Sequence, residues 1–526
     1  MNNSGGDHVH VDASTSGTIN VNGATGITGT LSGGEDLRFQ LDGNGSLNIS
    51  NNLNLTTTGG DDVRLDVGST VAGSTFRVDV GGTATFVQNN NLAGRDFQIL
   101  VYEDTELEVS GDITMTTNFT TPGILLLHAD GNGVVDCDAD INLNAIASGE
   151  TEIRLDGNSE LQIMGNFVRA ATPNDFGELD CATTATVEYN GTAAQVFSQD
   201  AGGGGDNFDY GIVEINNTFG TAPQLIMEGL ATVHGGIVFT DGIVSTTAAN
   251  LLVIDDGATV SGAADASHAD GPVRKVGNTG SFTSGTDGTR FPFPIGDGGI
   301  YMPLYITAPA AGTDAYDAEY IQIDPDPTYP AGYGDLDPTI HHISSCEYWH
   351  LTRSAGASNM IVELHYKDWD VPNFCSGVGV QAELLVTRHD GAIWRDYGNA
   401  ATSGVAANGV LRAGTSITAW ATPVPLTLAT TTANNPLPVE LLNFTAEVLD
   451  QSVELNWTTA TEINNDYFTI ERSLDGMNWE QVVQVDGAGN SNSILQYKEY
   501  DLSPYTGTSY YRLKQTDFDE QYSYSD

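Results

Sequence analysis

The stretch LDGNGSL, from Leu41 to Leu47, returns almost unchanged as LDGNSEL, from Leu155 to Leu161. Similar segments of alternating apolar and polar residues begin at Leu37, Val63, Phe97, Ile124, Glu152 and Glu178. Successive starts are 26, 34, 27, 28 and 26 residues apart, and the longest interval contains an extra strand-like piece, FRVDV. We therefore interpret the two heptads as the same turn of a repeating coil, several coils apart.

A period in the twenties, built from alternating residues and broken by Gly and Asn, is typical of a β-solenoid. One such unit cannot bury its apolar face alone, whereas stacked units can. The inward positions of two coils should be Leu41, Leu47 and Ile49, and Leu155, Leu161 and Ile163. The DGN between them fits a corner, because Asn and Gly accept left-handed backbone geometry. An all-β sandwich with regular strands is the structural alternative.

The composition is strongly acidic and uneven. The 526 residues include 18 Lys and Arg against 69 Asp and Glu, for a formal charge of −51, with no lysine before Lys275 and no tryptophan before Trp349. Such a surface repels nucleic acid and anionic membranes, so neither is an expected partner. We find no run of 18 apolar residues, and therefore expect no membrane insertion. The polar start and the abrupt end suggest a fragment of a longer exported protein.

We predict an all-β chain with a parallel β-helix, or solenoid, followed by two β-sandwich domains. The solenoid should occupy residues 1–270 and an antiparallel sandwich residues 271–427. A Thr-, Asn- and Pro-rich linker covers residues 428–438. Residues 439–526 should form a fibronectin type III-like sandwich with Trp457 in its core. HDGAIW, from His389 to Trp394, is typical of a hairpin turn.

The second half also resembles a known group of proteins. NNPLPVELLNFTAE, VELNWTTATEINNDYFTIERSLDGMNWEQV and SYYRLKQTDFD resemble a module of large surface and secreted proteins of Bacteroidota. That module usually precedes the C-terminal sorting domain of type IX secretion substrates. DGPVRKVGNTGSFTSGTDGTRFPFPIGDGGIYMPL and HHISSCEYWHLTR resemble the domain that commonly comes before it. The resemblance covers residues 270–526 and implies an extracellular or cell-surface location; the solenoid half resembles adhesin-like stalks.

The segment DGNGVVDCDAD is the best metal candidate. Its oxygen ligands would come from Asp130, Asn132, Asp136, Asp138 and Asp140. If the segment is a strand, Asp136, Asp138 and Asp140 point to one face, and calcium prefers such oxygens. Solvated surface acids are the alternative, because the glycine and final glutamate of an EF-hand are missing. The segment from Asp324 to Asp337 is a weaker candidate of the same kind.

Cysteines and histidines offer two further candidate groups. His341, His342, Cys346 and His350 suggest either a metal site or packing in a strand, and we favour packing. In an exported protein Cys346 and Cys375 would form a disulfide. Cys137 and Cys181 should lie on neighbouring or next-neighbouring coils, where stacking could bring them close.

No residue is predicted to be catalytic. The chain has no phosphate-binding loop, no HExxH zinc helix and no nucleophile elbow. We expect a non-enzymatic extracellular structural or adhesion protein, a surface stalk or filament component. The alternatives are a polysaccharide-degrading β-helix enzyme and a carbohydrate-binding protein. The ligand, a cell-surface molecule, polysaccharide or protein, is not identified by the sequence, and an open solenoid edge would allow self-association.

Overall fold

The computed structural model describes residues 9–13, 18–21, 27–31, 37–41, 44–57, 63–68, 75–89, 97–169, 177–198, 208–285, 288–325, 328–329, 335–367, 380–405, 407–420, 423–432, 441–449, 451–459, 462–491, 495–517 and 522–524. These residues form β-strands, turns and one short 3-10 helix, η1 (Gln381–Glu383). No helix in these ranges has the length and apolar character needed to span a membrane. The chain divides into two compact units: Met1–Tyr301, Ala308–Asp317 and Ser354–Gly356, and then Met302–Thr307, Ala318–Arg353 and Ala357–Asp526.

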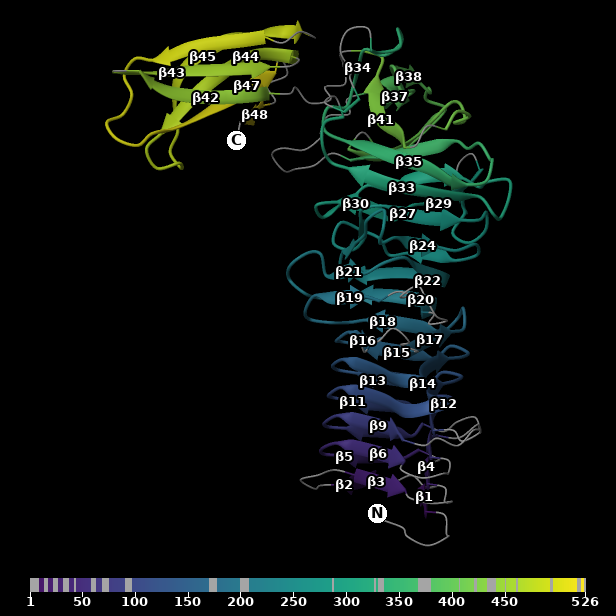
Figure 1. The fold of residues 1–526 in the computed structure, drawn as a ribbon. Helices are drawn as coiled ribbons and strands as arrows, with labels where there is room; N and C mark the ends of the chain where they lie inside the picture. The colour runs from purple at the N-terminus through teal and green to yellow at the C-terminus, as the bar shows by residue number, and fades with distance from the viewer. Residues whose placement is uncertain are drawn as a thin grey trace. The chain divides into compact units, whose positions relative to one another are not determined.

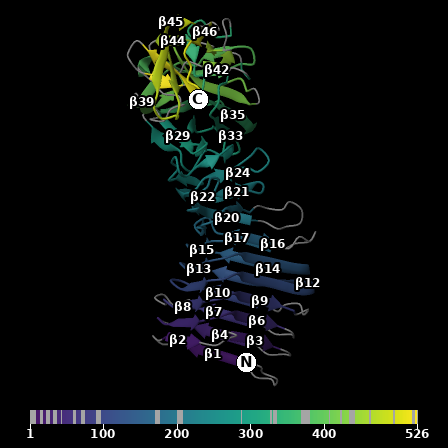
Figure 2. The same cartoon turned by 90° about the vertical axis from the view of Figure 1, so that its left-hand side faces the viewer.

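The first unit contains a β-solenoid of about 8 turns. Strands of successive coils pair in parallel and form three faces (Figures 1 and 2). Face 1 contains β1 (Val9–Ala13), β4 (Leu37–Leu41), β7 (Val63–Val67), β10 (Phe97–Val101) and β17 (Gly177–Cys181). Face 2 contains β2 (Thr18–Val21), β5 (Ser46–Ile49), β8 (Arg77–Val80), β11 (Glu106–Val109), β13 (Val134–Cys137), β15 (Glu160–Ile163) and β18 (Thr186–Tyr189). Face 3 contains β3 (Ile27–Leu31), β6 (Leu53–Thr57), β9 (Ala84–Gln88) and β16 (Phe167–Arg169).

Two long strands, β12 (Ile113–Ala129) and β14 (Ile141–Leu155), each contribute to two faces. The start of β12 pairs with β9 on face 3, and its end pairs with β10 on face 1. The register between β12 and β14 shifts between Phe119 and Gly123, where the chain passes from one face to the next. Each long strand therefore closes one coil and opens the following one.

The parallel pairing continues beyond residue 200. It includes β20 (Phe208–Asn216), β22 (Ala231–Asp241), β24 (Leu252–Ile254), β25 (Thr259–Ser261) and β27 (Val273–Val276). A second sheet contains β19 (Gln195–Phe197), β21 (Leu225–Met227), β23 (Val244–Ser245), β26 (Ala269–Asp270), β30 (Ile295–Asp297) and β31 (Ile300–Tyr301). A hairpin joins β28 (Thr283–Gly285) to β29 (Gly288–Pro292).

Parallel pairing continues past residue 270, the predicted end of the solenoid. Ala269 in β26 pairs in parallel with Ile295 in β30, and the first compact unit extends to Tyr301. The change in composition after Asp270 is a change in side chains. Parallel pairing depends on backbone groups, so it can persist after the repeat in side chains has ended.

The structure places the two heptads in equivalent positions. Leu41 pairs with Val67, and the same row continues through Val101 and Ala129 to Leu155. Leu47 and Leu161 are likewise connected through Val78, Leu107 and Val135. The prediction that both heptads are the same turn of a repeating coil is confirmed.

The apolar residues of each coil point inward and are closely packed. Leu155, Leu161 and Ile163 are 0% exposed, and Leu47 and Ile49 are 7% and 1% exposed. The side chain of Leu41 lies outside the described residues. Aromatic residues fill the interior in the later coils, where the Phe197 and Tyr210 ring centroids lie 5.1 Å apart. The solenoid interior is therefore a continuous core.

In the second unit, the strands before residue 432 pair in an antiparallel manner. One group contains β32 (Leu304–Thr307), β36 (Val362–Lys367), β39 (Ala401–Val405) and β40 (Asn408–Arg412). The other contains β34 (His342–Ile343), β35 (Tyr348–Ala355), β37 (Leu384–His389), β38 (Trp394–Asp396) and β41 (Val424–Thr430). Both β33 (Ala315–Ile321) and β35 are divided between the two units. His389 faces Trp394 across β37 and β38, so the predicted hairpin is confirmed.

The last seven strands form two antiparallel sheets (Figure 1). The first contains β42 (Leu441–Leu449), β43 (Ser452–Thr459) and β46 (Leu495–Asp501). The second contains β44 (Glu462–Ser473), β45 (Glu480–Ser491), β47 (Tyr510–Asp517) and β48 (Tyr522–Tyr524). A shared core of Val453, Leu455, Trp457, Phe468, Ile470 and Leu513 confirms the predicted position of Trp457.

The corner glycine of the second heptad provides a test of coil stacking. Gly157 has φ +68°, and a Cβ there would lie 2.9 Å from the carbonyl oxygen of Gly131 in the preceding coil. Gly157→Ala should lower the free energy of unfolding by roughly 1–3 kcal/mol, from backbone strain and this contact. Chemical denaturation measures the change. Gly220→Ala is the control, because its Cβ would meet nothing within 4 Å; equal effects of the two substitutions would contradict the stacked corner.

Candidate functional site: carboxylates on the solenoid surface

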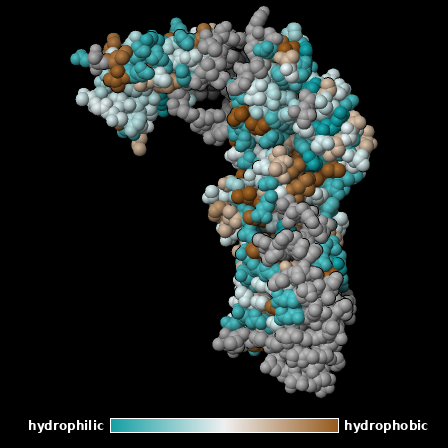
Figure 3. Space-filling view, viewed as in Figure 1, coloured by the Kyte–Doolittle hydropathy of each residue, from teal (hydrophilic) through white to brown (hydrophobic). Residues whose placement is uncertain are grey.

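An acidic row follows the outward side of face 2. In-register pairing connects Asp79, Glu108, Asp136, Gln162, Glu188 and Glu214 in six successive coils. Neighbouring strands in a sheet are about 4.8 Å apart, so the carboxylates lie close together along the row except where Gln162 separates Asp136 from Glu188. We call these residues the acidic row. In Figure 3, the described surface of these coils is coloured mostly as hydrophilic.

Arg77 is the cation that serves the start of the row. Its guanidinium group pairs with Asp79, with Glu106 at 2.6 Å and with Glu108. The face 2 strands that follow, β11, β13, β15 and β18, contain no Lys or Arg. Partial burial and the charges of Asp138 and Glu106 accordingly raise the pKa of Asp136. Burial also raises the pKa of Glu188, with a contribution from Glu214.

The five predicted calcium ligands do not form one cluster. β13 ends at Cys137, so the strand alternation that we expected to align Asp136, Asp138 and Asp140 does not extend to the last two. Asp130 accepts a hydrogen bond from the Gly131 amide at 2.7 Å. Asn132 donates to Asp104 at 2.8 Å, and Asp140 accepts from the Asn166 amide at 2.8 Å. These three side chains therefore stabilise turns between coils.

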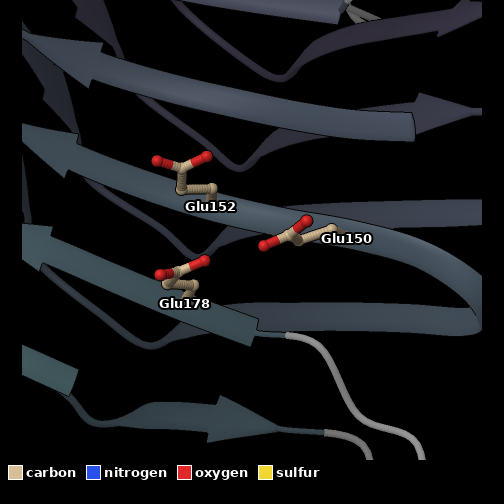
Figure 4. A group of neighbouring side chains, drawn as sticks. All are labelled: Glu150, Glu152 and Glu178. Atoms are coloured by element: carbon tan, nitrogen blue, oxygen red, sulfur yellow. The ribbon is translucent and has the colours of Figure 1, made fainter. Parts of the chain in front are cut away.

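A different group of carboxylates is brought together on face 1. Glu150 and Glu152 belong to β14, and Glu178 belongs to β17 in the next coil (Figure 4). One oxygen from each lies within 4.8 Å of the others. Pairing of Glu152 with Glu178 explains the contact between coils, and two-residue spacing places Glu150 on the same side of β14 as Glu152. We call these three residues the glutamate cluster.

The charge in the glutamate cluster is only partly balanced. Arg154 pairs with Glu152, whose side chain is 3% exposed, and lies 3.6 Å from Asp180. Burial raises the pKa of Glu178 to about 7, and the hydrogen bond with Glu150 adds to this shift. Near neutral pH, the Glu178 carboxyl group can therefore retain a proton. The same three carboxylates have the oxygen chemistry that a divalent cation requires.

Sequence reasoning missed the glutamate cluster, although a signal was present. Glu152 and Glu178 each begin one of the repeated segments, 26 residues apart. Equivalent positions of successive coils become neighbours, so two acids at one repeat position predict a close pair. Acids that are adjacent along the chain do not reveal this pair, because Glu152 and Glu178 become neighbours only when equivalent positions of successive coils are compared.

The cysteines and histidines have structural surroundings. Cys137 and Cys181 are both buried and free. Cys137 lies on face 2 and Cys181 on face 1, so the two residues do not stack on each other. Burial raises the pKa of the Cys137 thiol to about 11. Cys346 is disulfide-bonded, and its predicted partner Cys375 lies outside the described residues.

The histidines near Cys346 contact one another and nearby side chains. The Nδ1 atoms of His341 and His342 are 2.9 Å apart, and His350 Nε2 lies 2.9 Å from the Tyr329 hydroxyl. Among the described residues, these histidines do not belong to a group of three or more potential metal ligands. Residues 326–327 and 330–334 of the weaker calcium segment lie outside the described residues.

Comparisons with known proteins do not identify a family. No protein-family model matches the chain, and no curated protein matches it. A solved structure, the crystal structure of β-1,2-glucanase from Parabacteroides distasonis, is 14% identical over 37% of this chain, with a TM-score of 0.11. The alignment spans 33% of that structure's chain, and so low a TM-score supports no argument about fold or function.

The raised pKa of Glu178 predicts a pH dependence of stability. Its value of about 7 in the folded protein exceeds the ordinary 4.5, so unfolding releases a proton between these values. Stability should therefore fall as pH rises from about 4.5 to about 7 and then level off. Glu178→Gln should flatten this slope and raise the thermal midpoint at pH 8. The exposed Glu228→Gln is the control, and the same slope in all three proteins would contradict a proton held by Glu178.

A calcium titration distinguishes the two carboxylate groups. Calcium at about 1 mM, in the range of extracellular sites, should raise the thermal midpoint, because binding to the folded state stabilises it. The increase should disappear in Glu178→Gln and persist in an Asp136→Asn and Asp138→Asn double variant. The reverse pattern would assign the ion to the predicted aspartates, and the absence of any increase would contradict a calcium site at the glutamate cluster.

Proposed function

We propose that this protein is a non-enzymatic extracellular structural protein, with the solenoid acting as a surface stalk or spacer. The observation that carries the proposal is the in-register parallel pairing of successive coils around a continuous apolar interior. Each added coil lengthens such a stack by about 4.8 Å. The outward carboxylates keep it soluble, which suits a surface exposed to water.

We also propose that the second unit contains two β-sandwich modules. Residues 441–524 support a fibronectin type III-like module, because three- and four-stranded antiparallel sheets share the core around Trp457. The antiparallel strands between residues 302 and 430 would form the other sandwich. The disulfide at Cys346 favours an oxidising compartment, in agreement with export by type IX secretion to the cell surface.

The alternative, a polysaccharide-degrading enzyme, makes a different prediction for the carboxylates. Glycoside cleavage needs an acid and a second carboxylate across a groove. Glu178 forms a hydrogen bond with Glu150, and these two carboxylates lie on adjacent strands, β17 and β14. We therefore interpret Glu150 and Glu178 as a contact between neighbouring coils, and not as a catalytic pair.

An assay of polysaccharide cleavage tests the proposed function. The full chain should release no reducing ends from a panel of neutral and acidic polysaccharides, at pH 5 or pH 7. A stack of equivalent coils should also tolerate the loss of one coil. A variant lacking residues 125–150 should therefore still fold, because Leu125 and Thr151 occupy equivalent positions in successive coils. Circular dichroism and the thermal midpoint measure its folding. Release of reducing ends that is lost in Glu178→Gln and kept in Glu228→Gln would contradict the proposal.

A further inference from the structure

Figure 1 shows the sheet β45–β44–β47–β48. One side of this sheet carries aromatic rings and cations. Leu513 points into the core, so Arg512 and Lys514 point outward on either side of it. The Arg512 guanidinium lies 4.2 Å from the Trp479 ring centroid and 3.8 Å from that of Tyr524. Lys514 Nζ lies 3.8 Å from the Tyr522 centroid. We call these five residues the cationic face.

The ammonium group of Lys514 is exceptional in so acidic a chain. Arg512 pairs with Glu471 at 2.6 Å, and Lys498 on the other sheet pairs with Glu454 at 2.9 Å. Among the described residues Lys514 has contacts with two tyrosine rings and no ion pair. A half-buried cation that aromatic rings position, and that pairs with no carboxylate in the described part of the chain, can accept one from another molecule.

The composition of the cationic face is that of a binding surface. Tyr, Trp and Arg are the residues most enriched in interface hot spots. Tyr522 is 58% exposed, and Tyr510, on the same side of β47 as Arg512, is 51% exposed. Cation–π contacts also restrict the long side chains of Arg512 and Lys514, which lowers the entropy lost when they bind a partner.

The acidic row provides a surface of complementary charge in the same protein. Beyond Arg77 its strands carry carboxylates and no cations, and Asp136 has acidic neighbours at Asp138, Glu106 and Glu160. The row therefore offers carboxylates to a cation that approaches from another molecule, and its charge is complementary to that of Lys514.

We propose that the cationic face binds the acidic row of a second copy of this chain. Two different surfaces meet in this contact, so each copy keeps one surface free, and association continues into chains instead of stopping at a dimer. This partner goes beyond the proposed stalk function and does not depend on it.

Salt determines the conditions under which this contact forms. Two chains of charge −51 repel each other at long range, but at 0.15 M salt that repulsion is screened beyond about 8 Å. Contacts between Lys514 and a carboxylate act within that distance and survive. At about 1 M salt the screening length shortens to about 3 Å, so the attraction between Lys514 and the carboxylate should weaken as well.

Sedimentation equilibrium of the full chain tests the proposal. At 0.15 M salt the average mass should rise continuously with protein concentration, and at about 1 M salt the rise should shrink. Lys514→Glu should weaken association at least tenfold. Lys498→Glu is the matched control, with the same charge change on the other sheet, and should have little effect. Circular dichroism and the thermal midpoint verify that each variant is folded.

A charge swap identifies the acidic partner. Asp136→Lys alone should also weaken association, and combining it with Lys514→Glu in one chain should restore it. A wild-type protein that stays monomeric up to about 100 µM at both salt concentrations would overturn the inference. So would equal effects of Lys514→Glu and Lys498→Glu, or failure of the double variant to recover. A monomer that releases no reducing ends would overturn this inference and leave the proposed function standing.

Discussion

Hydrogen bonding between equivalent residues of successive coils is the interaction on which the rest of the first unit depends. A parallel strand cannot complete its hydrogen bonds alone, so each coil relies on the coils beside it. The same pairing fixes which side chains become neighbours. It connects Leu47 with Leu161 on the inside and Asp79 with Glu214 on the outside. Core and charged surface therefore follow from one register.

In this register, the acidity of the chain produces electrostatic repulsion between successive coils. Stacking equivalent positions places like charges about 4.8 Å apart, and like charges in adjacent strands destabilise a sheet. The protein offsets part of this repulsion with Arg77, which serves three carboxylates, and with Gln162, which interrupts the acidic row. Elsewhere a carboxyl group retains a proton, as the raised pKa of Glu178 indicates. A bound cation, or the cationic face of another copy, would act in the same direction.

The solenoid could be predicted from sequence because its information is local and repeated. The heptads at Leu41 and Leu155 revealed the period, and alternation within each segment identified Leu161 and Ile163 as inward residues. The glutamate cluster could not be found by examining neighbours along the chain, because Glu152 and Glu178 meet only through coil stacking. The expected alignment of Asp136, Asp138 and Asp140 assumed one strand, whereas β13 ends at Cys137, before the last two of them. The continuation of parallel pairing as far as Ile295 was missed because backbone pairing leaves little trace in composition.

Distances between spin labels along the acidic row test coil stacking most directly. Labels would be placed at Glu108 and, in turn, at Gln162, Glu188 and Glu214, after replacing Cys137 and Cys181 by alanine. These positions are two, three and four coils apart on one row. The account predicts that the distance grows linearly, by about 4.8 Å for each coil. Distances that do not increase in this order, as expected if these strands belonged to a β-sandwich, would contradict it.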